Sequence, residues 1–287
     1  MAVRVRRFAA GLAALAAILL LPYPRPAPAQ TPPPAKPEMT ENCPGLVASD
    51  APRLIPAAWQ LAALNPDQVR ITFAGHSTFL IESPQLVRIA TDYNDYVRPP
   101  VVPDIITMNH AHDTHYTDRP DPAIKYVLRG WGPSPDQPAR YDLQVKDVRV
   151  RNVPTNIRNW GGGTERNGNS IFIFEIANMC IAHLGHLHHR LTKDHLDELG
   201  RIDVLMVPID GSYTMGQPLM VDVIKQIQPK LVLPMHYWGR SQVERFQGLM
   251  QPLDADFVWP EHPTIDVVRE ELPQNLTVIV LGGNGGD

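Results

Sequence analysis

The chain has 287 residues, a formal net charge of −4 and 44% hydrophobic residues, which is ordinary for a globular protein. Its 2 cysteines exclude a disulfide-rich scaffold and a cysteine-rich zinc ribbon, and its mildly acidic charge gives no electrostatic reason to expect nucleic acid as a partner. Its 11 histidines are the unusual number, so their positions are the first guide to function.

The N-terminus predicts a signal peptide. Arginines in the first seven residues precede an apolar run over residues 8–21, which is shorter than the roughly 20 residues of a membrane-spanning helix. Residues 27–29 (Ala-Pro-Ala) then fit a cleavage site. We therefore expect residues 1–29 to be removed and the mature protein to be periplasmic or secreted, without stable membrane insertion. An uncleaved N-terminal anchor is the alternative.

A proline-rich segment follows the predicted signal peptide. Prolines at residues 31–38 disfavour helix and sheet, so residues 30–53 are expected to form a linker. Cys43 in this linker could pair with Cys180 in an oxidising compartment, and two unpaired thiols are the alternative. Residues 54–287 show no internal repeat and are expected to form a single domain.

The first half of this domain predicts strands. Two short strands lie around Gly75-His76 within residues 69–82, and others are expected at residues 86–91, 104–108, 126–128, 148–153 and 170–176. Three consecutive glycines at residues 161–163 predict a loop between the last two strands.

The second half predicts strands that alternate with helices. The expected strands are residues 180–184, 204–208, 231–234, 264–268 and 276–281, and the expected helices are residues 192–199, 219–227 and 241–250. Thr192 is the expected N-cap of the first helix and Gly200 ends it. The change from consecutive strands to alternating strands and helices predicts a layered α/β domain.

The densest group of histidines follows the strand predicted at residues 104–108. His110 and His112 lie two residues apart and point the same way on an extended chain, and His115 can fold back toward them if the loop tightens. Imidazole nitrogens held this close suit a borderline metal ion such as zinc. A polar surface loop rich in histidine is the alternative.

Two further histidines follow later strands. His186 comes after a glycine at the end of residues 180–184, and His236 comes just after residues 231–234. His183, inside the first of these strands, fits a core or supporting histidine equally well. Because ligands in layered α/β folds gather at one sheet edge, we expect the strand-end histidines to meet.

These segments resemble the metallo-β-lactamase superfamily, in the branch of metal-dependent hydrolases that includes bacterial ascorbate-phosphate lactonases. The resemblance covers most of residues 69–281. It rests on residues 71–78 (the opening hairpin), Asp92 (a structural aspartate), residues 110–115 (the HxHxDH loop), residues 163–169 (a Gly/Arg/Asn stretch), residues 183–189 (the HLGDLGH segment), and residues 203–208 and 234–237 (the closing motifs). It implies an α/β fold, an αββα sandwich with one or two metal ions along its edge.

Some positions depart from the family pattern. Thr114 occupies the aspartate position of HxHxDH, and His186 stands where the family has an aspartate that usually bridges two metals. Asn156, or no residue, replaces a further family histidine. Without these carboxylates two close dications would repel each other with little compensation, so a one-metal site becomes more plausible.

The motifs and the resemblance together predict the site. The predicted metal ligands are His110, His112, His115, His186 and His236. The predicted cofactor is zinc, as one or two ions, with iron or manganese as alternatives. Asp113 and Thr114 are the predicted catalytic residues. Asp113 would orient or deprotonate a water molecule only if the loop shifts its register, and Thr114 can offer a hydrogen bond.

Weaker candidates surround this site. His76 is either a supporting residue or a capped turn histidine, and Asp210 either lines the pocket or forms an ordinary turn. Five aromatic side chains could form an apolar rim for a small-molecule substrate: Tyr116, Trp160, Tyr213, Tyr237 and Trp238.

The sequence thus predicts an exported metal-dependent hydrolase that uses metal-bound water or hydroxide on an ester, lactone, amide or phosphoester. The missing aspartates motivate the alternative, a metal- or ligand-binding protein without hydrolytic activity on the same fold. A redox site with iron or copper on histidines is a third possibility. The sequence leaves the substrate and the oligomeric state open.

Overall fold

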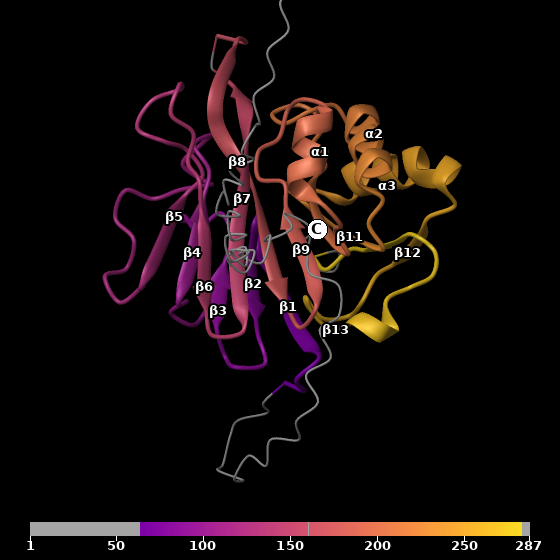
Figure 1. The fold of residues 1–287 in the computed structure, drawn as a ribbon. Helices are drawn as coiled ribbons and strands as arrows, with labels where there is room; N and C mark the ends of the chain where they lie inside the picture. Colours follow the sequence, from indigo (N-terminus) through magenta and orange to yellow (C-terminus); the bar gives the residue numbers. More distant parts are fainter. Residues whose placement is uncertain (1–63, 160, 283–287) are drawn as a thin grey trace, which may run out of the picture. The chain divides into compact units, whose positions relative to one another are not determined.

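The structure is a computed structural model that describes residues 64–159 and 161–282 (Figure 1). The predicted signal peptide, the predicted linker with Cys43, the predicted domain start at residue 54 and Trp160 lie outside the described residues. Export and the Cys43–Cys180 pairing therefore stay predictions. In the described part, no helix is long and apolar enough to cross a membrane.

The first sheet has six strands in the order β13-β1-β2-β3-β4-β5. Its strands are β1 (Gln68–Gly75), β2 (Thr78–Glu82), β3 (Arg88–Ala90), β4 (Ile105–Met108), β5 (Tyr126–Arg129) and β13 (Thr264–Val268). The pairs from β13 to β3 are antiparallel, and β3, β4 and β5 are parallel. The sheet is therefore mixed.

The second sheet has eight strands in the order β12-β14-β11-β10-β9-β8-β7-β6. Its strands are β6 (Asp142–Val145), β7 (Val148–Arg158), β8 (Thr164–Ile176), β9 (Met179–His183), β10 (Val204–Pro208), β11 (Leu231–Met235), β12 (Asp256–Val258) and β14 (Thr277–Ile279). It is parallel from β12 to β9 and antiparallel from β9 to β6.

The helices lie on one face of the eight-stranded sheet (Figure 1). They are α1 (Lys193–Leu199), α2 (Gln217–Ile227) and α3 (Arg240–Met250), with short 3-10 turns η1 (Gln251–Leu253) and η2 (Arg269–Glu271). Thr192 caps α1 through its side chain, as the sequence predicts, and Gly200 ends it. The three predicted helices are confirmed to within two residues at each end.

Strand β8 shows how one sequence serves two cores. Ile171 and Ile173 contact the helical layer, whereas Phe172 and Phe174 fill the space between the two sheets. The side chains alternate because successive residues of a strand point to opposite faces. This alternation places one apolar core between the sheets and another under the helices.

Loops rather than helices cover the outer face of the six-stranded sheet in the described part of the chain. Tyr116 and Trp131 pack there against a small core that contains Ile106 and Met108. The connections between β3 and β5 are rich in proline and aspartate, which disfavour helix. The resemblance implies a helical layer here as well, and these loops take its place.

Candidate metal centre

Five histidine rings from both sheets gather at one edge of the molecule. They are His76 in the turn between β1 and β2, His112 and His115 after β4, His186 after β9, and His236 after β11. Neighbouring rings within this histidine group have centroids 4.2 to 6.2 Å apart. Strand ends that lie far apart in the sequence thus supply one cluster of nitrogens.

Three of these residues bring one nitrogen each within 4.8 Å of the others: His76, His115 and His236. The backbone N–H of His236 donates to the carbonyl of His76 at 2.7 Å, which joins the two sheets at this point. His76 and His236 have φ angles of 51° and 55°, and Asp92 beside them has 42°. These are left-handed conformations, which are uncommon for residues other than glycine.

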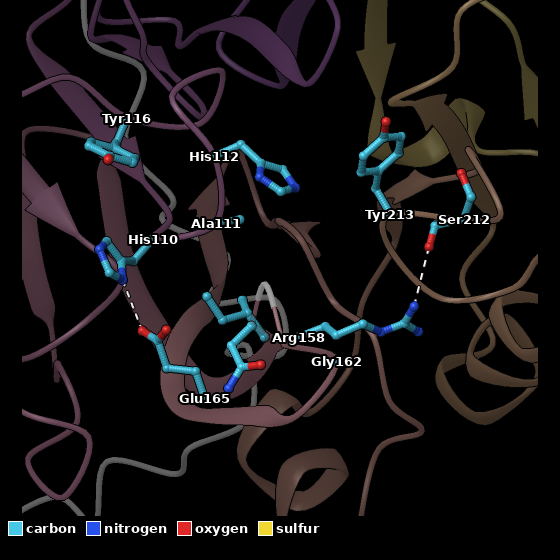
Figure 2. Close-up of a pocket in the computed structure, with 11 residues that line it drawn as sticks. His110, Ala111, His112, Tyr116, Arg158, Gly162, Glu165, Ser212 and Tyr213 are labelled. Carbon is cyan, nitrogen blue, oxygen red and sulfur yellow. Dashed lines mark hydrogen bonds and ion pairs between the residues drawn. The ribbon is translucent and has the colours of Figure 1, made fainter.

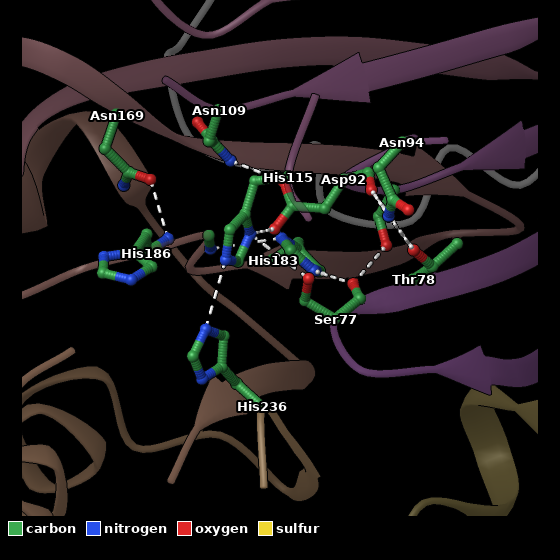
Figure 3. A network of polar contacts seen from close by, with 12 residues as sticks. Ser77, Thr78, Asp92, Asn94, Asn109, His115, Asn169, His183, His186 and His236 are labelled. Carbon is green, nitrogen blue, oxygen red and sulfur yellow. Dashed lines mark hydrogen bonds and ion pairs between the residues drawn. The ribbon is translucent and has the colours of Figure 1, made fainter. Parts of the chain in front are cut away.

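A buried carboxylate fixes the orientation of the His115 ring (Figure 3). The Nδ1 of His115 lies 2.6 Å from Oδ2 of Asp92, and Asn109 donates to Oδ1 of the same carboxylate at 2.8 Å. Burial alone would raise the pKa of Asp92, but His115, His183 and these hydrogen bonds lower it to about 2. Asp92 is therefore an anion that holds a proton on Nδ1 of His115 and leaves Nε2 to face the cluster.

His236 has a similar arrangement. Its Nδ1 lies 3.3 Å from Oδ1 of Asp210, outside good hydrogen-bond geometry. Asp210 also accepts hydrogen bonds from the backbone of Ser212 and Thr214. Burial alone would raise the pKa of Asp210, but the nearby His236, the Thr214 hydroxyl and the backbone N–H of Ser212 lower it below its ordinary value. Asp210 is thus a second anion behind a cluster histidine.

The two Nε2 atoms of His115 and His236 lie 3.2 Å apart (Figure 3). In the tautomers that carry the proton on Nδ1, the two Nε2 lone pairs would face each other, an arrangement that a metal ion stabilises and a hydrogen bond does not. Two nitrogens bound tetrahedrally to zinc at 2.0–2.1 Å would lie about 3.3 Å apart. The spacing therefore fits two ligands of one metal ion.

His186 and His76 carry unmet hydrogen-bonding capacity. His186 is 1% exposed, and neither of its ring nitrogens has a hydrogen-bond partner. Burial, followed by the neighbouring histidines, lowers the pKa of His186 to about 2 and that of His76 to about 3. The buried Nε2 of His76 also has no hydrogen-bond partner. Buried neutral imidazoles with unused lone pairs are the groups that a metal ion satisfies.

A tight turn positions His186. Gly185 has a φ of 59°, and a Cβ at this position would lie 2.4 Å from side-chain atoms of both Asn109 and Asn169. Asn169 accepts a hydrogen bond from the backbone N–H of His186 at 2.8 Å (Figure 3). The glycine therefore lets the chain pass between two asparagines and turn His186 into the cluster.

Comparison with known proteins agrees with this geometry. The β-lactamase superfamily domain matches residues 70–236, more than half of the chain. The chain belongs to the metallo-β-lactamase superfamily. Its α/β fold, with two mixed sheets in a single domain, is the metallo-β-lactamase fold, which confirms the predicted fold class.

The curated relatives are called UPF0173 metal-dependent hydrolases. The one from Archaeoglobus fulgidus is 26% identical over 204 residues, covering 62% of this chain and 87% of the relative. The one from Thermococcus kodakarensis is 28% identical over 196 residues, covering 59% and 84%. The chain is therefore similar to UPF0173 metal-dependent hydrolases over most of their length.

Solved structures share the fold of this chain. A proposed zinc-dependent hydrolase of the metallo-β-lactamase superfamily from Thermotoga maritima is 29% identical, with a TM-score of 0.53, and the match covers 74% of this chain and 97% of that one. A metallo hydrolase from Ignicoccus hospitalis shares the fold at 21% identity and a TM-score of 0.50, covering 70% of this chain and 98% of that one.

The structure separates the predicted metal ligands. His112, His115, His186 and His236 lie in the histidine group, but His110 does not. The Nδ1 of His110 lies 2.9 Å from Oε1 of Glu165, and its ring packs against Trp131. The first histidine of the superfamily's HxHxDH loop thus faces a neighbouring pocket in this chain (Figure 2).

The predicted catalytic residues lie at the mouth of the site. Asp113 is exposed and accepts a hydrogen bond from the Tyr96 hydroxyl at 2.7 Å. Asp113 and the half-buried Thr114 both line the pocket above the metal cluster. Their catalytic roles therefore stay proposals.

His76 is the functional candidate that sequence reasoning underrated. The sequence placed it only as a supporting or turn residue, although the Gly75-His76 pair at a hairpin is a usable signal. Asp210 forms the turn and approaches His236, but it is not among the residues that line the two pockets of this site. His183 has a supporting role, because its Nε2 donates to the Ser77 carbonyl and its Nδ1 accepts from the backbone of Gly185.

Two pockets adjoin the histidine group. The metal pocket, of about 560 Å³, is lined by His76, Ala111, His112, Asp113, Thr114, Tyr116, Tyr213, His236 and Trp238. Tyr213 and Trp238 are 54% and 60% exposed and form an edge-to-face pair with ring centroids 5.4 Å apart. Three of the predicted rim residues are therefore present, whereas Tyr237 stacks on Phe73 instead.

Proposed function

We propose that the protein is a hydrolase that binds one zinc ion through His76, His115 and His236, which would leave a fourth position open to water or substrate beside His186. The 3.2 Å separation between Nε2 of His115 and Nε2 of His236 carries this proposal, because both Nδ1 atoms face carboxylates. The relatives called metal-dependent hydrolases support the reaction class. His110 would instead act outside the ligand set.

The charges in the cluster favour one ion over two. Asp92 and Asp210 lie behind His115 and His236, so neither carboxylate bridges the ring nitrogens. The remaining donors are neutral imidazoles, which compensate the repulsion between two dications poorly. Iron or manganese in the same ligand set is the alternative to zinc.

The chain's own residues would bind and orient the substrate. When bound, zinc would polarise the scissile group and lower the pKa of a water molecule to about 7. Asp92 would keep the His115 ring in its orientation, and Tyr213 and Trp238 would seat an apolar part of the substrate. Esters, lactones, amides and phosphoesters are the proposed substrate classes, in a periplasmic or secreted protein.

The test combines metal content with activity. We expect one zinc ion per chain by elemental analysis of the purified protein. We also expect hydrolysis of at least one member of an ester, lactone, amide and phosphodiester panel, lost with chelator and restored by zinc. His262→Gln, which changes an exposed histidine outside the histidine group, is the control and should leave the metal content and the activity unchanged. Purified protein without stoichiometric transition metal would contradict the proposal.

The missing carboxylates at Thr114 and His186 favour a second candidate, a metal-binding protein without hydrolytic activity. The double variant Thr114→Asp, His186→Asp distinguishes the two candidates. If the wild-type protein binds metal but cleaves nothing in the panel, while the double variant gains activity, the protein is a binding protein.

A further inference from the structure

A second pocket beside the metal pocket contains an uncompensated positive charge. It has a volume of about 350 Å³ and shares Ala111, His112, Tyr116 and Tyr213 with the metal pocket. Arg158, the last residue of β7, extends across it toward Ser212 (Figure 2). The guanidinium donates to the Ser212 carbonyl at 3.4 Å, and no carboxylate of the described residues forms an ion pair with it.

The acidic group of this pocket does not neutralise Arg158. Glu165 lines the same pocket, but its carboxylate lies 2.9 Å from Nδ1 of His110. The side chains of Glu165 and His110 are 31% and 45% exposed, so this pair forms one wall of the pocket. In Figure 2 the Arg158 side chain extends away from this pair toward Ser212. The pocket therefore offers an exposed guanidinium that has no carboxylate partner among the described residues and can pair with an anionic group of a ligand.

The Asp210–Thr214 turn connects Arg158 to the metal centre. Ser212, which holds the guanidinium, lies two residues after Asp210, whose carboxylate is 3.3 Å from His236. Two peptide units span at most about 7.6 Å between Cα atoms. Tyr213, the residue after Ser212, lines both pockets. A single small molecule can therefore reach both the metal centre and Arg158.

We propose that the second pocket binds a carboxylate group of the substrate through Arg158 while the scissile bond lies at the metal centre. This inference rests on the proposed function and narrows its substrate class to carboxylate-bearing esters, lactones or amides. A guanidinium recognises a carboxylate through two parallel hydrogen bonds.

The binding test uses a matched pair of ligands on the protein as purified. Monobenzyl succinate carries the carboxylate, and benzyl methyl succinate is its neutral ester. By calorimetry we expect the wild type to prefer the acid at least about tenfold, in line with a charge-assisted hydrogen bond. In Arg158→Gln this preference should fall about tenfold, and Arg158→Lys should keep part of it.

Arg166→Gln is the control for charge. Arg166 is exposed, pairs with Asp136, and does not line the second pocket. Its variant should keep the wild-type preference. A wild type that prefers neither ligand, or an Arg158→Gln variant with the full preference, would overturn the inference.

An activity measurement separates this inference from the proposed function. Mono-4-nitrophenyl succinate and 4-nitrophenyl butyrate differ in the carboxylate but release the same phenol. We expect a higher kcat/KM for the succinate and a rise in its KM in Arg158→Gln. If neither ester is cleaved while the binding preference depends on Arg158, the hydrolase proposal fails and the carboxylate site stands. If both are cleaved equally in wild type and variant, the carboxylate site fails.

Discussion

Two histidines of residues 109–115 lie in different surroundings. His115 faces the histidine group (the metal side), and His110 faces the second pocket (the pocket side). On one side His115 is fully buried, and Asp92 holds its Nδ1. On the other side His110 is half-exposed and paired with Glu165 in an open pocket. Burial next to a carboxylate leaves Nε2 of His115 in need of a ligand, whereas water can still reach the His110 ring. A histidine motif therefore does not by itself define a metal ligand.

The residues around His115 and around His110 differ in the same way, in burial and in hydrogen-bond partners. On the metal side, His76 and His186 have pKa values lowered by burial and ring nitrogens without hydrogen-bond partners. On the pocket side, the polar groups retain solvent or hydrogen-bond partners. The ring nitrogens on the metal side are thus more buried and have fewer polar partners than those on the pocket side.

The sharpest test of this comparison changes one histidine on each side. We expect His115→Gln to weaken zinc binding by at least about 100-fold, because loss of a ligand outweighs the 10–100-fold cost of losing an outer partner. His110→Gln should change zinc affinity less than about threefold. Competition with a chromophoric chelator measures both. Equal losses would show that His110 is a ligand as the HxHxDH motif implies.

A smaller effect is expected from the carboxylate behind the metal side. Asp92→Asn removes the anion that orients His115 and should weaken zinc binding by about 10- to 100-fold. Glu165→Gln changes the corresponding carboxylate behind His110 and should leave zinc affinity unchanged. The same chelator competition gives both values. A larger loss in Glu165→Gln would reverse the assignment of the two sides.

The turn before His186 can be tested through stability. Gly185→Ala places a methyl group against Asn109 and Asn169 at a positive φ, and should lower the free energy of unfolding by about 2 kcal/mol. Gly248→Ala, in α3 with no atom within 4 Å of the added methyl, should raise it by about 0.5–1 kcal/mol. Urea denaturation measures both. A neutral Gly185→Ala would show that the two asparagines do not enforce the turn.

The smallest effect concerns His183, which supports the metal side without facing it. Burial lowers the pKa of this histidine, whereas the unfolded chain takes up its proton near pH 6.5. Its contribution to stability is therefore complete above pH 6.5 and is lost as the pH falls. Between pH 6.5 and 5.5 the wild type should lose up to about 1 kcal/mol more than His183→Gln. An identical pH dependence of unfolding in the two proteins would contradict this.

Local patterns predicted much of the fold and part of the site. Alternation along β8 and the cap at Thr192 were readable because they depend on neighbouring residues. The meeting of His186 and His236 followed from the rule that ligands gather at strand ends. The edge strands β6 and β12 were missed because they are short and partly polar.

The prediction for His110 and the low weight given to His76 failed for physical reasons. Period-two spacing predicted that His110 and His112 point the same way, but residues 109–115 form a turn in which the N–H of His115 donates to the carbonyl of His112. His76 meets His236 across 160 residues of sequence, through a contact between the two sheets. Neither a turn of this kind nor a pairing over this distance is encoded in nearby residues.

The left-handed backbone at His76, Asp92 and His236 has a consequence for evolution. Each such residue costs on the order of 1–2 kcal/mol relative to a relaxed conformation, and glycine at the same position would avoid that cost. At His76, whose buried Nε2 has no hydrogen-bond partner, a library of variants selected for thermal resistance alone should therefore accumulate glycine early, whereas at Asp92 the loss of the hydrogen bonds with His115 and Asn109 would oppose it. Such variants would be more stable but would lack a residue of the metal site. Glycine there would then indicate relaxed selection on function.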